Sequence, residues 1–129
     1  MCIRDRTQAI LRYLGKILPG TNGNPMYPGN DDALKMHAID SLNLYNDDFF
    51  PKYVPFVLPI HPEYKNRDEH FLAFITKHFP AWLAHIESVL NKSSGKYLFG
   101  DNFTTADCTT GAVFIKLCWN DHYEHNLIL

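Results

Sequence analysis

The sequence predicts an all-α fold. Apolar residues recur at steps of three and four in three segments of the 129-residue chain, which is the spacing of one helix face. Thr104 to Asp107 form a capping-box pattern ahead of a fourth apolar segment. No segment alternates apolar and polar residues as a half-buried strand does. At this length the chain is expected to form one compact domain.

Composition argues against several classes of partner. The 12 basic and 14 acidic residues are spread along the chain and give a net charge of -2, so no charged block suits nucleic acid or an anionic membrane. No apolar run approaches the roughly 20 residues of a membrane span, and the first seven residues are polar where a signal peptide is apolar. We therefore expect a cytoplasmic protein. Its three cysteines include no CxxC pair and predict no disulfide framework.

The first predicted helix covers residues 7–18, with Thr7 as its N-cap. Its apolar stripe consists of Ile10, Leu14, Ile17 and Leu18. Residues 19–30 contain three Gly, three Pro and three Asn, so we expect an irregular surface connection there.

The second predicted helix begins near residue 30 or 31. Its apolar stripe consists of Leu34, Ala38, Leu42, Tyr45 and Phe49. A proline inside a helix costs about 3 kcal/mol, so Pro51 and Pro55 predict that the helix ends or kinks near Phe50. Residues 52–58 are then either a bent continuation or a separate short piece.

The third predicted helix covers residues 66–91, with a kink at Pro80. Its apolar stripe consists of Phe71, Ile75, Phe79, Leu83, Ile86 and Leu90.

The fourth predicted helix begins at the capping box. The Thr104 hydroxyl is expected to accept from the Asp107 amide, while the Asp107 carboxylate accepts from the Thr104 amide. Phe103 and Cys108 are placed to form a hydrophobic staple. Residues 112–119 are apolar on more than one face, which is typical of a central buried helix.

Two of these motifs resemble cytosolic glutathione transferases of the mu, pi, alpha and sigma classes. Residues 7–15 look like the helix that closes the glutathione site, and residues 100–107 are similar to the family's buried capping box. Both occur in the family's order, separated by two long helices. The resemblance covers residues 7–119 and implies a helical bundle like the family's C-terminal domain, with the thioredoxin-like N-terminal domain almost entirely missing.

The resemblance implies a domain organisation. Residues 1–6 are a leader outside the family, 7–18 the last helix of a truncated thioredoxin-like domain, 19–30 a linker, and 31–129 the C-terminal helical domain, incomplete at its C-terminus. Arg6 stands where the family has a glutathione-contacting Gln. We expect an inactive fragment of a homodimeric transferase whose parent conjugates the glutathione thiolate to small apolar electrophiles. The alternative is a non-catalytic dimerisation or scaffold module.

The resemblance also implies ligand-binding residues, with glutathione as co-substrate, but no catalytic residue, because the thiol-activating Tyr or Ser of the first strand has no counterpart here. Thr7 matches a residue that binds the γ-glutamyl carboxylate; its alternative role is an ordinary cap. Asp40 matches an acidic residue that reaches the γ-glutamyl amino group in the partner subunit; its alternative role is a solvated helix carboxylate. Asn46, Phe50 and Tyr53 fall where the family lines its electrophile pocket; their alternative role is core packing.

Other candidate sites are expected to be structural. Asp107 is explained by its capping role. The histidine pairs at 78 and 85 and at 122 and 125 lack surrounding ligands and the HExxH spacing, so no metal site is expected. No other cofactor is expected.

The isolated chain is expected to expose apolar faces that the missing half of the parent would cover. Phe49, Phe50, Phe71 and Trp82 are the candidates. We therefore expect self-association or poor solubility.

Overall fold

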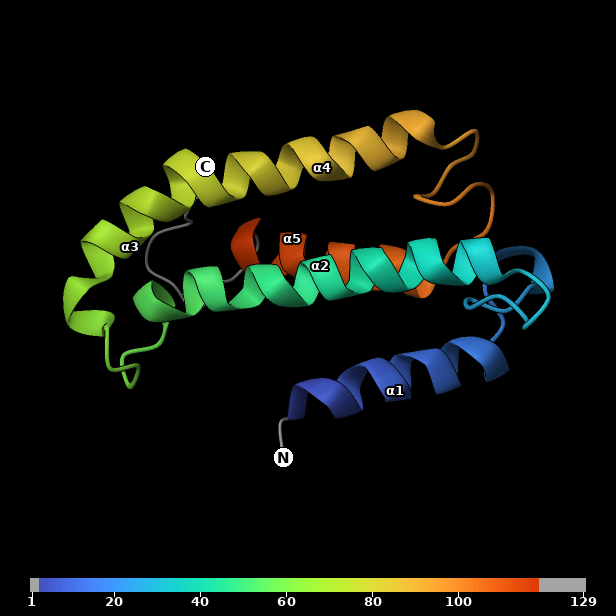
Figure 1. Cartoon of the computed structure of the whole chain (residues 1–129), viewed down its shortest axis with the longest axis horizontal. Coiled ribbons are helices and arrows are strands. Elements are labelled where there is room, and N and C mark those ends of the chain that lie inside the picture. The colour runs from blue at the N-terminus through green and yellow to red at the C-terminus, as the bar shows by residue number, and fades with distance from the viewer. Residues whose placement is uncertain (1–2, 119–129) are drawn as a thin grey trace.

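The computed structural model describes residues 3–118 of the chain, with the side chains of residues 7–117 (Figure 1). This part is all-α, as predicted, and contains no β-strand. The helices are α1 (Ile3–Ile17), α2 (Ala33–Val57), α3 (Arg67–Ala73), α4 (Phe79–Lys92) and α5 (Thr105–Cys118). A π-helical turn, Phe74–His78, joins α3 to α4, and short 3-10 turns cover Thr21–Gly23 and Tyr64–Asn66.

The helices are arranged around α2. The α3–α4 unit arches over one side of α2, α1 lies on the opposite side, and α5 packs against α2 (Figure 1). The core is rich in aromatic rings. Its buried helical residues are Ile39, Leu42, Phe49, Tyr53, Phe56, Val57, Phe74, Phe79, Trp82, Ile86, Ala106, Val113 and Leu117.

Helix α1 corrects two predictions. It already includes Ile3, so Thr7 lies inside the helix and is not its N-cap. The reason is local, because Arg4-Asp5-Arg6 contains no Gly or Pro that would stop a helix. The predicted apolar stripe is also not buried: its four members are 39–57% exposed, whereas α1 buries Gln8 and Gly15 instead.

The connection between α1 and α2 is only partly a surface loop. Tyr27 is buried, and its amide donates to the Gly15 carbonyl at 2.9 Å. The neighbouring residue, Met26, contacts α5, because its carbonyl accepts from the Thr105 amide at 3.0 Å. The prediction of an irregular connection is confirmed, but Met26 and Tyr27 within it are hydrogen-bonded to α5 and α1.

Helix α2 is longer than predicted. Asp32 is its N-cap and accepts from the Lys35 amide at 3.1 Å, and the helix then continues through Pro51 and Pro55 to Val57. Of the two predicted alternatives, a separate short piece after Phe50 is therefore wrong, whereas a continuation of the same helix is what the structure shows. Tertiary packing, which provides most helix stability in proteins, compensates for the missing amide donors because the aromatic face of α2 is buried on both sides of the prolines.

The predicted kink before Pro80 is a π-helical turn. The Phe79 amide donates to the Phe74 carbonyl, five residues back, so the turn holds one residue more than an α-helical turn. This shifts the buried face. Phe74 is 0% exposed while Ile75, a member of the predicted stripe, is 36% exposed, and Trp82 is buried together with the predicted stripe members Phe79 and Ile86.

The start of α5 is close to the prediction. The Asp107 carboxylate accepts from the Thr104 amide at 2.8 Å, as expected of a capping box. The Thr104 hydroxyl, however, donates to the same carboxylate at 2.7 Å, and the Asp107 amide donates to the Thr104 carbonyl. The second carboxylate oxygen accepts from the Leu98 amide at 2.9 Å, so Asp107 also ties the preceding loop to the helix.

Helix α5 is buried on one face only. Val113 and Leu117 are buried, whereas Ala112, Ile115 and Lys116 are exposed. The prediction of a central helix buried on more than one face is therefore wrong over the described residues, and Trp119 lies outside them.

Candidate ligand-binding site

A pocket of about 480 Å³ lies between α1, α2 and α5. Such a volume falls within the usual range for small-molecule sites. Four of the five predicted ligand-binding residues line it, whereas Asp40 does not. The complete lining consists of Thr7, Asn46, Asp47, Phe50, Pro51, Tyr53, Thr109, Ala112, Val113 and Lys116.

Helix α2 supplies the aromatic wall of the pocket. Asn46, Phe50 and Tyr53 are spaced by four and three residues, so one face of the helix carries all three. The Phe50 and Tyr53 rings meet edge to face with centroids 4.7 Å apart. Phe50 is 41% exposed and Tyr53 is buried, so the wall runs from the solvent into the core.

Asn46 is a structural residue as well as part of the lining. It is buried, and its side-chain amide donates to the hydroxyls of Thr109 and Thr110 at 3.0 and 2.9 Å. Its carbonyl oxygen accepts from the Trp82 indole at 3.0 Å. Its polar atoms therefore bind α5 and α4. This supports core packing, the alternative role that the sequence analysis gave to Asn46.

Helix α5 supplies the opposite wall, and sequence reasoning did not assign any of its residues to the pocket. Thr109, Ala112, Val113 and Lys116 are spaced as one helix face, a signal that could have found them. The Lys116 ammonium lies 4.4 Å from the centroid of the Phe50 ring. This places a positive charge over the exposed end of the aromatic wall.

Helix α1 borders the pocket through Thr7. Because Thr7 is the fifth residue of α1, its amide has an intrahelical acceptor and does not belong to the free amides of a helix N-terminus. The alternative role of Thr7 as an ordinary helix cap is therefore wrong, and its role in binding the γ-glutamyl carboxylate stays a prediction. Asp47, another lining residue that was not predicted, accepts from the Gln8 amide at 2.6 Å and ties α2 to α1.

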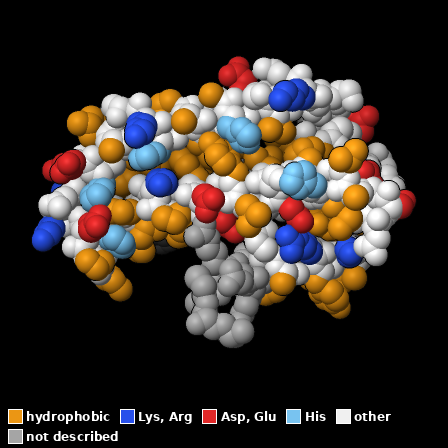
Figure 2. Space-filling view, viewed as in Figure 1, with side chains coloured by type: hydrophobic (Ala, Val, Ile, Leu, Met, Phe, Trp, Pro, Cys, Tyr) orange, Lys and Arg blue, Asp and Glu red, His pale blue; other side chains and the backbone are white. Residues whose placement is uncertain are grey.

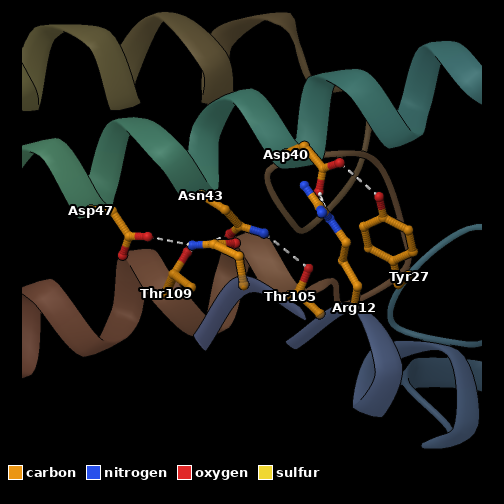
Figure 3. A network of polar contacts seen from close by, with 8 residues as sticks. Arg12, Tyr27, Asp40, Asn43, Asp47, Thr105 and Thr109 are labelled. Carbon is orange, nitrogen blue, oxygen red and sulfur yellow. Dashed lines mark hydrogen bonds and ion pairs between the residues drawn. The ribbon is translucent and has the colours of Figure 1, made fainter. Parts of the chain in front are cut away.

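Asp40 lies elsewhere on α2, outside the pocket lining and beside Arg12 and Tyr27 (Figure 3), and its side chain is 22% exposed. It accepts from Arg12 Nε at 3.0 Å and from the Tyr27 hydroxyl at 2.9 Å. The hydrogen bond to Asp40 raises the pKa of Arg12, and burial followed by the same carboxylate raises the pKa of Tyr27. Arg12 is therefore charged and Tyr27 protonated at neutral pH, and the trio joins α1 and the loop to α2.

A row of polar contacts joins α2 to α5 (Figure 3). Asn43 is fully buried, donates to the Thr105 hydroxyl at 3.3 Å and accepts from the Thr109 hydroxyl at 2.7 Å. Thr109 also accepts from Asn46, so one residue belongs both to this row and to the pocket lining. The row fixes the distance between the two walls.

The described part of the chain offers no metal cluster and no activated thiol. Among residues 7–117 no group of three His, Cys, Asp or Glu side chains could hold a metal ion, and His122 and His125 lie outside this range. Burial and then Asp107 raise the pKa of the Cys108 thiol, which keeps it protonated at neutral pH. None of the described helices is long and apolar enough to cross a membrane.

Comparison with known proteins assigns most of this architecture to a family. A family model described as glutathione S-transferase, C-terminal domain, matches residues 47–124, which is more than half of the chain. The match includes the second half of α2, all of α3, α4 and α5, and every pocket residue except Thr7 and Asn46. Neither the curated proteins nor the solved structures include a match to this chain.

Proposed function

Because the chain belongs to the glutathione S-transferase C-terminal domain family, we propose that it is the helical part of an enzyme that conjugates glutathione to small apolar electrophiles. The pocket between α1, α2 and α5 is the electrophile site. The observation that carries this proposal is that Thr7, Asn46, Phe50 and Tyr53, each chosen from the sequence as a ligand residue, line one pocket.

The physical character of the pocket suits an apolar ligand. One wall of the pocket is the edge-to-face pair of Phe50 and Tyr53. The side-chain amide of Asn46 is hydrogen-bonded to Trp82 and α5, so its polar atoms do not face the ligand. Aromatic walls with few polar groups are typical of sites for apolar small molecules. The reacting thiolate would come from glutathione, since burial and Asp107 raise the pKa of the Cys108 thiol.

The glutathione contacts are part of the same proposal. Thr7 would hold the γ-glutamyl carboxylate through its exposed hydroxyl rather than through a helix end. Asp40 would accept the γ-glutamyl amino group bound in a partner subunit, sharing its carboxylate with Arg12 and Tyr27. A carboxylate has about four acceptor sites, so two further bonds are compatible with those two. The parent is then a cytoplasmic homodimer of the mu, pi, alpha and sigma group, and this chain alone is inactive.

Calorimetric titration with 1,3-dinitrobenzene, an aromatic electrophile analogue without a leaving group, tests the electrophile site. Phe50→Ala should weaken binding about tenfold, because an aromatic contact of about 1.5 kcal/mol is removed. Leu44→Ala is the matched control, since Leu44 is similarly exposed on α2 and lies outside the pocket. Equal affinities for the wild type and Phe50→Ala would contradict the assignment of the pocket.

A second candidate function is a non-catalytic dimerisation or scaffold module. The exposed apolar stripe of α1 supports it, because this stripe could bind another chain without any reaction. Titration of 1,3-dinitrobenzene into the chain separates the two functions, because the electrophile site lies within this chain: the scaffold role predicts no saturable binding to the pocket.

A further inference from the structure

A second cavity, of about 260 Å³, lies between α2, the π-helical turn and α4. It shares no lining residue with the pocket between α1, α2 and α5. Cavities for drug-sized ligands are usually larger, so this one suits a small molecule. Its lining consists of Tyr45, Asp48, Phe49, Lys52, Lys77, His78 and Ala81.

Basic side chains gather around this cavity. Lys52 comes from α2, whereas Lys77 and His78 come from the π-helical turn. Burial, then Lys52 and then Lys77, lower the pKa of His78, so both ammonium groups lie close enough to act on the imidazole. Figure 2 shows Lys or Arg and His side chains close together over the space between α2 and the α3–α4 unit.

The charges of the lining do not balance. Asp48 is its carboxylate and can offset one of the two lysines, so positive charge remains in excess. Like charges held around one cavity repel each other, and a bound anion removes that repulsion. The cations are presented partly by a π-helical turn, a feature that is frequent at functional sites. The cavity therefore favours an anionic ligand.

The rest of the lining is apolar. Phe49 is buried, Tyr45 is half-buried, and Ala81 completes this side of the cavity. A bare inorganic anion would leave these groups without a contact, whereas an organic anion would cover them. A phosphate monoester combines both features, because its phosphate group carries a charge of about -1.5 to -2 at pH 7 and its organic group is uncharged.

We propose that this cavity binds small phosphate monoesters. The phosphate group lies among Lys52, Lys77 and His78, whose nitrogen atoms donate charge-assisted hydrogen bonds to its oxygens. The organic group packs against Tyr45 and Phe49. This site is separate from the proposed electrophile site and adds a second ligand to the chain.

Calorimetric titration of the full chain with phenyl phosphate, at about pH 7.5 where its phosphate group is a dianion, tests the site. Lys52→Met and Lys77→Met each remove one positive charge and keep an apolar stem. Each should weaken binding about fivefold, the size of effect typical of an exposed charge pair. Asp48→Asn removes the opposing carboxylate and should strengthen binding about twofold. Unchanged affinity in both lysine variants would overturn the inference.

A matched variant controls for general surface charge. Lys65→Met removes an exposed lysine of the 3-10 turn Tyr64–Asn66 that lines neither cavity, and it should bind phenyl phosphate as the wild type does. A loss as large as in Lys52→Met would show that the phosphate group binds to any basic surface and would overturn the inference.

Two further titrations identify the ligand and its location. Inorganic phosphate lacks the organic group and should bind more weakly than phenyl phosphate; equal affinities would overturn the assignment to monoesters. Phe50→Ala should leave the affinity for phenyl phosphate unchanged, because Phe50 lines only the other pocket. A fall in this variant would place the ligand in the proposed electrophile site and would overturn the inference without affecting the proposed function.

Discussion

At the scale of single residues, Asn46 shows how one position can be both part of a site and part of a core. Its side chain bridges α2 to α4 through Trp82 and to α5 through Thr109 and Thr110. Buried polar groups are costly unless they are hydrogen-bonded, and here each polar atom of the amide has a partner. The hydrogen bonds of Asn46 therefore hold together the helices that form the walls of the aromatic pocket.

Asn46→Ala should destabilise the chain by about 2–4 kcal/mol, because it leaves the buried Trp82 indole and two threonine hydroxyls without their partner. Urea unfolding followed by fluorescence measures the change. Asn91→Ala, an exposed asparagine on α4, is the control and should stay within about 0.5 kcal/mol of the wild type. A loss below 1 kcal/mol for Asn46→Ala would show that the bridge contributes little.

His78, in the π-helical turn, should make stability depend on pH. Burial, then Lys52 and Lys77, lower its pKa in the folded chain from the ordinary 6.5. The folded state therefore binds this proton less readily than the unfolded state, so stability is lost as pH falls below about 6.5. The unfolding free energy of His78→Gln should decline less steeply over that range than that of the wild type. His37→Gln, an exposed histidine of α2, should follow the wild type, and parallel curves for all three would contradict the prediction.

The predictable residues are those whose environment is set by nearby sequence. The Asp107 cap follows from a four-residue pattern, and Phe50 and Tyr53 follow from helical spacing combined with the family resemblance. The role of Asn46 could not be predicted, because its partners lie 36 and more residues away. Helical spacing could have placed Lys116 on one face with Thr109 and Val113, but it does not tell that this face of α5 meets α2 across a pocket.

At the scale of helices, α1 packs through its small and polar face. A Cβ atom added to Gly15 would lie 2.7 Å from Thr105 Cγ2 and 2.8 Å from Tyr27 Cβ, so only glycine permits this approach to α5 and the loop. The Gln8–Asp47 and Arg12–Asp40 contacts lie on the same side of the helix. Hydrophobic periodicity alone predicted that the opposite, apolar face of α1 would be packed. Periodicity identifies which side of a helix carries apolar residues, but not which side contacts the rest of the chain.

Gly15→Ala should destabilise the chain by about 1–3 kcal/mol through overpacking. Gly111→Ala is the matched control, because this glycine is also helical but its added Cβ would meet nothing within 4 Å. The control should be stabilised by up to about 1 kcal/mol, since alanine is the better helix former. Chemical unfolding of both variants measures the sign of each change. Stabilisation of Gly15→Ala would mean that α1 moves away from α5 without cost.

At the scale of the whole molecule, apolar surface gathers on α1. Tyr13 and the four residues of the predicted stripe are all exposed, and hydrophobic side chains lie along the corresponding lower edge of the molecule (Figure 2). The earlier candidates were largely wrong: Trp82 and Phe49 are buried and Phe71 is half-buried, which leaves Phe50. The fold class could be predicted from periodicity, whereas the exposed side of the molecule could not.

The chain should self-associate through this face of α1, because contiguous exposed apolar surface favours association. Sedimentation velocity should show a weight-average coefficient that rises with concentration for the wild type and rises much less for Ile10→Gln/Ile17→Gln. Leu34→Gln/Ile60→Gln, which changes two isolated and more exposed residues, should behave as the wild type. A wild type that stays monomeric across the concentration series would contradict the prediction.

The π-helical turn before Pro80 is a place where the chain can lose one residue and keep its core. The buried residues Phe74 and Phe79 are five positions apart, whereas one face of an α-helix recurs at steps of three or four. Deletion of Thr76 would shorten that step to four and leave Phe74, Phe79, Trp82 and Ile86 on one continuous α-helical face. The near-ultraviolet circular dichroism of the aromatic core should therefore survive this deletion. Deletion of Ala84, inside α4, should diminish that signal, because each residue of an α-helix adds about 100° of rotation and Ile86 would turn away from the core.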